Sequence, residues 1–196
     1  MKRRRAALGV GAALVIFLLA DAFMPPPAHD VHSPGGVSVK VTLFESNETV
    51  AWKPTAPSQS LASLSCYSPG KGTPCDVTTW ASSHPSLSQS PQPLFLVWTG
   101  CIDWSGGGEI KSWQGFNIEY IPSTRKLVIH CYRAQGWLYV RQYEYGVAAV
   151  PRYTLAVVST ADIGGPGMIT IIEEDDLEHL VGDQSDQSQL ATVTIS

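Results

Sequence analysis

The segment WLYVRQYEY, residues 137–145, carries the side chains best suited to binding chemistry in this sequence. In a β-strand, alternate side chains point to opposite faces, so one face of this segment would be mostly aromatic. That face consists of Trp137, Tyr139, Arg141, Tyr143 and Tyr145. If exposed, it would form a platform for a sugar ring, a peptide or another protein, because Trp and Tyr supply rigid area with a polar tip. If buried, the same rings would belong to the core, and both interpretations stay open.

The four cysteines favour disulfides over a metal site. There is no C-x-x-C pair to begin a zinc or redox site. An even number of cysteines in an exported chain favours disulfides. Pro-Gly and Thr-Pro lie between Cys66 and Cys75 and favour a chain that folds back on itself. We therefore predict the bonds Cys66–Cys75 and Cys101–Cys131, with free buried thiols as the alternative.

Histidines and carboxylates give weaker signals for catalysis. His130 shares a predicted strand face with Val128 and Tyr132, and we expect a hydrogen-bonded, partly buried side chain there rather than a catalytic base. A general acid and base pair on scattered carboxylates would make the chain a small secreted hydrolase. The carboxylates available for such a pair include Asp103, Glu109 and Glu119.

Two segments contain metal-binding residue types. His29-x-x-His32, with Met24 nearby, offers imidazole and thioether groups that suit copper, but the ligands are few and a polar tether is expected. The acidic stretch 173–186 supplies oxygen ligands suited to calcium, although it lacks the order of an EF-hand loop. A solvated acidic loop is the expectation for that stretch, and no metal or cofactor is predicted.

Several catalytic motifs are missing from the sequence. It has no G-x-S-x-G elbow, no phosphate-binding G-x-x-x-x-G-K-[ST] loop and no H-E-x-x-H, and the Gly-rich connection 105–108 leads into no periodic helix. A serine-nucleophile or nucleotide-binding enzyme is therefore unsupported. A binding or structural role is favoured over catalysis, and the hydrolase is the alternative.

The N-terminus indicates export. Four basic residues precede fifteen uncharged, mostly apolar residues, 6–20, and the small-x-small sequence Ala20-Asp21-Ala22 follows. This pattern is typical of a secretory leader, with cleavage expected after Ala22. The alternative is an uncleaved anchor helix that runs to Met24 and stops at the prolines after it. Both interpretations place residues 28–196 outside the cytoplasm, either secreted or tethered to the membrane.

The charge of the chain excludes some partners. Loss of residues 1–22 leaves 9 basic and 16 acidic residues, a net charge of −7. An acidic domain repels phosphate backbones, so nucleic acid is not expected as a partner. We expect an unknown protein or glycan ligand, and membrane contact only through the N-terminal segment if it is uncleaved.

Residues 37–196 are predicted to form one all-β domain, preceded by the leader or anchor, 1–22, and a flexible tether, 23–36. Eight or more short, mainly antiparallel strands separated by turn signals favour a β-sandwich or a partly open barrel. Ser- and Pro-rich loops are expected at 54–65 and 82–93. The predicted strands include 37–44, 94–98, the hairpin 116–133, 154–160, 168–174 and 191–196. Outside the leader, only residues 173–181 favour a helix, of two turns at most.

Overall fold

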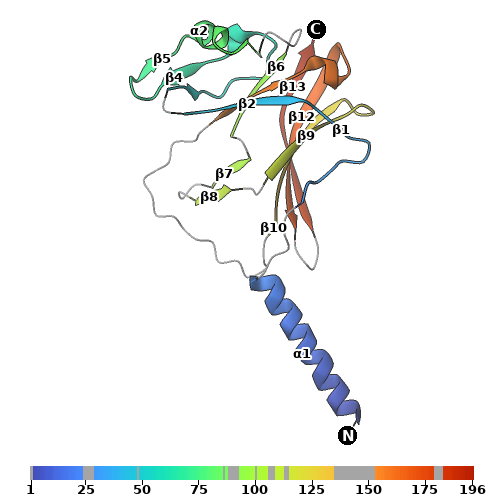
Figure 1. Cartoon of the computed structure of the whole chain (residues 1–196). Coiled ribbons are helices and arrows are strands. Elements are labelled where there is room, and N and C mark those ends of the chain that lie inside the picture. Colours follow the sequence, from blue (N-terminus) through green and yellow to red (C-terminus); the bar gives the residue numbers. More distant parts are fainter. Residues whose placement is uncertain are drawn as a thin grey trace.

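The structure is a computed structural model in which strands dominate, so the predicted all-β class is confirmed (Figure 1). The helices are α1 (Lys2–Phe23), α2 (Val77–Ser82) and the single-turn 3-10 segments η1 (Leu61–Ser63) and η3 (Thr160–Ile163). The residues described are 2–23, 29–47, 49–85, 87, 93–99, 101–105, 109–112, 115–134, 153–178 and 183–196.

The largest sheet has five strands in the order β1-β9-β10-β12-β13. Its strands are β1 (Val37–Ser38), β9 (Gly115–Ile121), β10 (Lys126–Ala134), β12 (Gly167–Glu178) and β13 (Gln184–Ile195). The β9–β10 hairpin was predicted and is present. All neighbours are antiparallel except β10 and β12, which run parallel from the pair Lys126–Thr170 to the pair Ala134–Glu178.

A three-stranded sheet has the order β2-β11-β6 and is antiparallel throughout. Its strands are β2 (Val41–Glu45), β6 (Leu94–Trp98) and β11 (Thr154–Val158). Every residue of β6 is buried, as its uninterrupted apolar sequence predicted. Leu94, Leu96 and Trp98 pack into one core cluster and Phe95 and Val97 into another, so β6 is covered on both faces.

The main core lies between these two sheets. Apolar side chains from β6 and β11 pack there against alternate residues of β9, β10 and β12. Leu127, Ile129 and Cys131 of β10 point into this core, whereas Val128 and His130 line a pocket on the other face of the sheet. The alternation of β10 therefore places its apolar residues inside and its histidine outside the core.

Residues 37–45 form two strands, where the sequence predicted one. β1 pairs with β9 of the larger sheet, and β2 pairs with β11 of the smaller sheet. Between them, the amide of Val39 donates to Ile118 O and the amide of Lys40 donates to the Asp162 carboxylate. The chain thus crosses from one sheet to the other at this point, which period-two alternation alone does not reveal.

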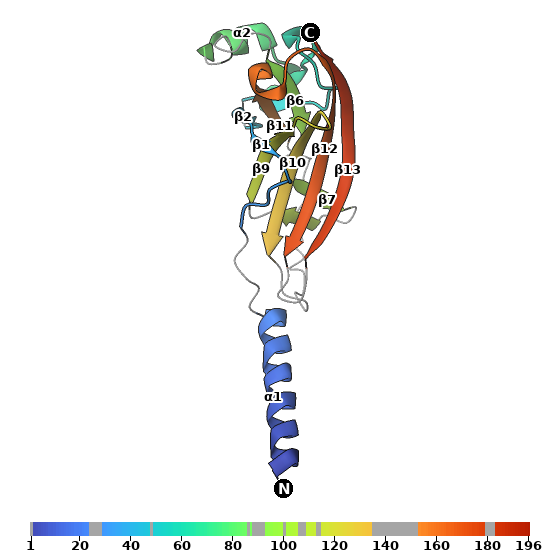
Figure 2. The ribbon, with the colours of Figure 1, turned by 90° about the vertical axis from the view of Figure 1, so that its right-hand side faces the viewer.

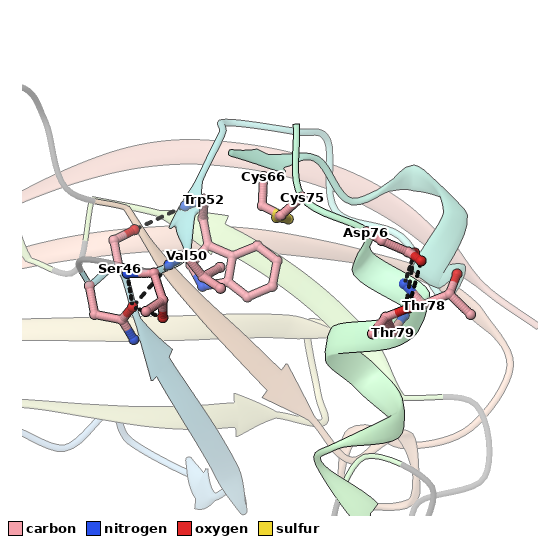
Figure 3. Close-up of a disulfide and its surroundings, with 10 residues drawn as sticks. Ser46, Val50, Trp52, Cys66, Cys75, Asp76, Thr78 and Thr79 are labelled. Atoms are coloured by element: carbon pink, nitrogen blue, oxygen red, sulfur yellow. Dashed lines mark hydrogen bonds between the residues drawn. A yellow bond between two sulfur atoms is a disulfide. The ribbon is translucent and has the colours of Figure 1, made fainter. Parts of the chain in front are cut away.

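A second core cluster lies on the far face of the smaller sheet, under a three-stranded sheet of order β3-β4-β5. Its strands are β3 (Ala51–Trp52), β4 (Cys66–Ser68) and β5 (Thr73–Pro74). Ala51 and Trp52 pair with β4, which in turn pairs with β5. Figure 3 shows Trp52 beside the Cys66–Cys75 disulfide. In the same view Asp76 caps α2 by accepting bonds from the amides of Thr78 and Thr79.

The acidic residues 173–178 lie in β12, so the helix predicted from residue 173 is wrong over that range. The backbone of β12 pairs with β10 on one side and with β13 on the other. Two ladders of hydrogen bonds and the buried Ile169 and Ile171 outweigh the weak preference of a short isolated helix. Residues 179–181 lie outside the described part of the chain.

The helix α1 stands apart from the strands in both views (Figures 1 and 2). Its apolar side chains are exposed, among them Val10, Leu14 and Ile16. Within the described residues, no helix has the length and apolar character needed to cross a membrane. The remaining two strands, β7 (Ile102–Ser105) and β8 (Glu109–Ser112), form a separate antiparallel pair.

Candidate functional site

A set of acids and histidines lies on the outer face of the larger sheet, away from the main core. We call it the acid–histidine cluster. Its members come from β9, β10 and β12 and from the segment 29–36 that precedes β1. They are His32, Ser33, Glu119, His130, Glu174 and Asp176.

His130 lies at the centre of the acid–histidine cluster and is 2% exposed. Its Nδ1 is 3.0 Å from Asp176 Oδ2 on the neighbouring parallel strand. Its Nε2 is 2.9 Å from Ser33 Oγ and 3.6 Å from Glu119 Oε2. Glu174 Oε2 is 3.8 Å from Nδ1. The imidazole is therefore enclosed by three carboxylates and one hydroxyl.

The pKa of His130 is raised above its ordinary value. Burial by itself disfavours the imidazolium, but the hydrogen bond with Asp176 and the charges of Asp176, Glu174 and Glu119 outweigh that penalty. In the imidazolium form both ring nitrogens donate, one to Asp176 and the other to Ser33 Oγ. The protonated ring thus balances part of the negative charge buried around it.

Glu119, 2% exposed, holds the segment 29–36 against the sheet. Its Oε1 is 2.5 Å from Nδ1 of His32, and its Oε2 accepts the amide of Ser33 at 2.8 Å. A Cβ at Gly36 would lie 2.5 Å from Glu119 Oε2, so glycine lets the backbone approach the carboxylate closely. The second half of the segment predicted as a tether therefore lies against the domain.

Two further contacts attach the same segment. Asn117 Nδ2 donates to Val31 O at 2.7 Å, and the Tyr132 hydroxyl donates to the Asp30 carboxylate. The bond to Asp30, together with burial and the Asp30 charge, raises the pKa of Tyr132 to about 12. Tyr132 therefore remains a donor through the physiological pH range.

A cavity of about 240 Å³ borders the acid–histidine cluster. His32, Ser33 and Pro34 form one wall, and Val128, His130 and Glu174 form the other. The sequence of contacts Ser33–His130–Asp176 has the order of a nucleophile, a base and an orienting acid. The cluster also contains Glu119, which already accepts the Ser33 amide.

A second cavity, of about 310 Å³, lies beside the edge of β6, and we call it the β6-edge pocket. It is lined by residues 55–57 and 96–99 and by Tyr153, and across from them by Glu173, Leu190 and Ala191. Most of these side chains are apolar, and no Lys, Arg or His is among them. The pocket thus lies between β6 of the smaller sheet and β12–β13 of the larger one.

A β-bulge shapes one wall of the β6-edge pocket. The pairing of β12 with β13 shifts between Ile171, opposite Ala191, and Ile172, opposite Gln189. Leu190 is therefore the extra residue, and it lines the pocket with 39% of its surface exposed. Bulges commonly redirect a side chain next to a functional site.

Two polar atoms of the lining residues lack a partner. Trp98 Nε1 and Thr55 Oγ1 are buried and have no hydrogen-bond partner within the described structure. Trp98 is only 5% exposed and packs edge-on against Phe116. Buried polar groups are normally bonded, and because these two atoms are closed to solvent, a ligand could bond to them only if the side chains of the lining shift.

The predicted site residues have different outcomes. Both predicted disulfides, Cys66–Cys75 and Cys101–Cys131, are present, and they indicate an oxidising, extracytoplasmic environment. The aromatic face of 137–145 lies outside the described residues, as does most of the Gly-rich connection 105–108. Those two predictions remain predictions.

The predicted acids and metal ligands are distributed as follows. Of the carboxylates named for acid–base chemistry, Glu119 lies in the acid–histidine cluster, beside the hydrogen-bonded His130. In the acidic stretch, Glu173 and Asp175 point toward Cys131, but its sulfur belongs to a disulfide and is not free to bind a metal. Among the described residues, this is the one group of three whose potential ligand atoms all lie within 4.8 Å of one another.

No family model, curated protein or solved structure matches this chain. We therefore infer the function of the chain from the acid–histidine cluster and the β6-edge pocket. Ser33 was not selected from the sequence, and Asp176 was considered only as part of the acidic stretch 173–186, because their partner His130 lies 97 and 46 residues away along the chain. Trp98 and Thr55 had no signal beyond their positions in a strand and a loop.

Proposed function

We propose that the chain is an exported, extracytoplasmic binding domain that holds its ligand in the β6-edge pocket. The supporting observation is a mostly apolar cavity of about 310 Å³ whose lining residues include Trp98 and Thr55, each with a buried polar atom that has no hydrogen-bond partner in the described structure. An apolar pocket with a few polar groups is the usual form of a small ligand site. The ligand would carry an apolar body and at least one hydrogen-bonding group.

We also propose an architecture for the domain and a role for its N-terminal residues. We propose a β-sandwich, because the five-stranded and three-stranded sheets share one core. We also propose that residues 1–22 are a signal peptide removed on export. The exposed apolar side chains within residues 10–19 of α1 support this proposal. An uncleaved membrane anchor is the alternative for α1.

The pocket is tested with p-cresol as a probe, since it has an apolar ring and one hydroxyl. In the purified full chain with its disulfides intact, p-cresol should shift the NMR signal of the Trp98 indole N–H in a saturable way. Ala56 is exposed and lines the pocket, so Ala56→Trp should fill it and weaken binding at least about tenfold. Ala62, exposed in η1 and not part of the lining, provides the control Ala62→Trp. No shift of Trp98, or equal binding by both variants, would contradict the proposal.

A second candidate function is a small secreted hydrolase that uses carboxylate and histidine acid–base chemistry on the same fold. The contacts Ser33 Oγ–His130 Nε2 at 2.9 Å and His130 Nδ1–Asp176 Oδ2 at 3.0 Å favour it. Two features oppose it. The raised pKa keeps His130 protonated over a wider pH range, so it is a poorer base, and Glu119 accepts the amide that could stabilise an oxyanion.

A fluorophosphonate reagent separates the two functions, because it reacts covalently with an activated serine hydroxyl. We expect little or no adduct on Ser33 by peptide mass spectrometry, since the raised pKa of His130 favours the imidazolium, which cannot accept the serine proton. Ser33→Ala is the matched control for labelling elsewhere in the chain. An adduct on Ser33 that this variant lacks would instead support the hydrolase.

A further inference from the structure

Among the described residues, the edge of β6 that faces away from β11 has one short strand-like contact, with the loop 54–60. Ser58 pairs with Phe95 in an isolated antiparallel bridge. The Phe95 amide donates to Ser58 O at 2.8 Å, and the Ser58 amide donates to Phe95 O at 3.1 Å. This edge of β6 therefore already accepts a strand-like partner at one residue.

Val97 presents the next pair of backbone groups on that edge. In an antiparallel sheet, the N–H and C=O of one residue point to one neighbour and those of the next residue point to the other. Because the backbone groups of Phe95 point to Ser58, those of Val97, two residues later, point to the same side. In the register of the bridge Ala56 would face Val97, but no backbone hydrogen bond joins them. Both Ala56 and Val97 line the β6-edge pocket.

Four hydrogen-bonding groups without a described partner thus occur on the residues around one cavity. They are the N–H and C=O of Val97, Trp98 Nε1 and Thr55 Oγ1. The two Val97 groups are a donor and an acceptor at the spacing of a β-ladder, which a peptide backbone matches and a compact small molecule does not. Val97 is also buried, so leaving these groups unpaired is unfavourable.

We propose that the ligand is an extended peptide segment that adds to β6 as an antiparallel strand. This inference rests on the proposed function of the β6-edge pocket. The residue opposite Val97 exchanges two backbone bonds with it. The residue opposite Trp98 directs an apolar side chain toward Leu190 and Ala191, because it lies on the face of β6 that meets the larger sheet.

The lining also selects the charge of the peptide. Among the described residues that line it, Glu173, which already has an interaction of its own, is the one carboxylate, and there is no Lys, Arg or His. The domain without residues 1–22 has a net charge of −7. A neutral or basic peptide with one apolar anchor is therefore favoured over an acidic one.

The test uses the capped probe peptide acetyl-KTVTLTVTK-amide, in which Leu is the anchor for the pocket. Adding it to the full chain should slow amide exchange at Val97 and shift the Trp98 indole signal, both in a saturable way. The two threonines next to Leu would bond to β6, so methylating both of their amides should weaken binding at least about tenfold. Methylating the Leu amide, which points away from β6, is the matched control and should change affinity by less than about threefold.

The outcomes separate this inference from the proposed function. If p-cresol shifts Trp98 but the peptide does not, the pocket binds a small molecule and the peptide inference is wrong. If the doubly methylated peptide binds as well as the parent, strand addition is wrong. If Val97 becomes protected as protein concentration rises without peptide, a second copy of the chain is the occupant and the inference is also overturned. If neither probe binds, both proposals fail.

Discussion

Replacing Cys101 and Cys131 together by alanine should lower the free energy of unfolding by roughly 3 to 4 kcal/mol. The bond joins residues separated by 30 positions, and in the chain-entropy account a longer closed loop restricts the unfolded chain more. Both cysteines are buried in the core between the sheets, so alanine avoids placing a hydroxyl there. Urea unfolding without reductant, followed by tryptophan fluorescence, measures the loss.

The matched control for this variant is the pair Cys66→Ala and Cys75→Ala. That bond spans only 9 positions, for which the same account gives roughly 2.7 kcal/mol. It also lies at the second cluster, beside Trp52, rather than between the two main sheets (Figure 3). A larger loss from the shorter loop would show that local packing, and not loop closure, sets the contribution of each bond.

Substituting His130 by leucine should destabilise the protein by roughly 3 to 5 kcal/mol, because it leaves buried carboxylates without their cationic partner. Glu119 is 2% exposed and Asp176 is 8% exposed, so water cannot replace the imidazole easily. His32→Ala is the control, since His32 also contacts Glu119 but its side chain is 58% exposed. We expect His32→Ala to lower the unfolding free energy by no more than about 1 kcal/mol.

The pH dependence of unfolding provides the second readout for His130. Its pKa is raised in the folded state, so its stabilising contribution is fully present below the unfolded pKa of about 6.5. The contribution is lost as the pH rises through the higher folded value. Wild type should therefore lose stability as the pH rises above about 6.5 and through the raised folded value, and His130→Leu should lack this component. Equal slopes for the two proteins would show that the pKa of His130 is the same in the folded and unfolded states, and would contradict the raised pKa.

Local sequence signals predicted the parts of the fold that local chemistry determines. The turn residues between Cys66 and Cys75 place the two sulfurs together, and the uninterrupted apolar run 94–98 is a strand buried on both faces. The hairpin of β9 and β10 likewise follows from alternation on both sides of a turn.

Non-local pairing explains what the sequence did not reveal. Residues 37–45 alternate as one strand, yet Val37 pairs with Tyr120 and Phe44 pairs with Leu155 in different sheets. The acidic run of β12 is extended because β10 and β13 bond to it from either side. These partners are distant along the chain, and no short pattern records which strand a given edge will meet.

The candidate sites also combine features that the sequence predicted with features that only the fold reveals. His130 was expected to be hydrogen-bonded because a histidine within an apolar strand needs a partner. Its partners Ser33 and Asp176 come from opposite ends of the domain, and only the fold brings them together. The β6-edge pocket depends on a single bulged residue, Leu190, and on the strand edge left open beyond Ser58, neither of which has a sequence signature.

The attachment of residues 29–36 to the sheet also determines how the domain responds to mechanical force. A pull on the chain at residue 29 reaches the contacts of Asp30, His32 and Ser33 first, and then the two residues of β1. Neither disulfide lies between α1 and these contacts, so the segment can peel off while the covalently closed core remains intact. Residues 29–38 are therefore the part of the domain that such a pull would load first, before either disulfide-closed loop.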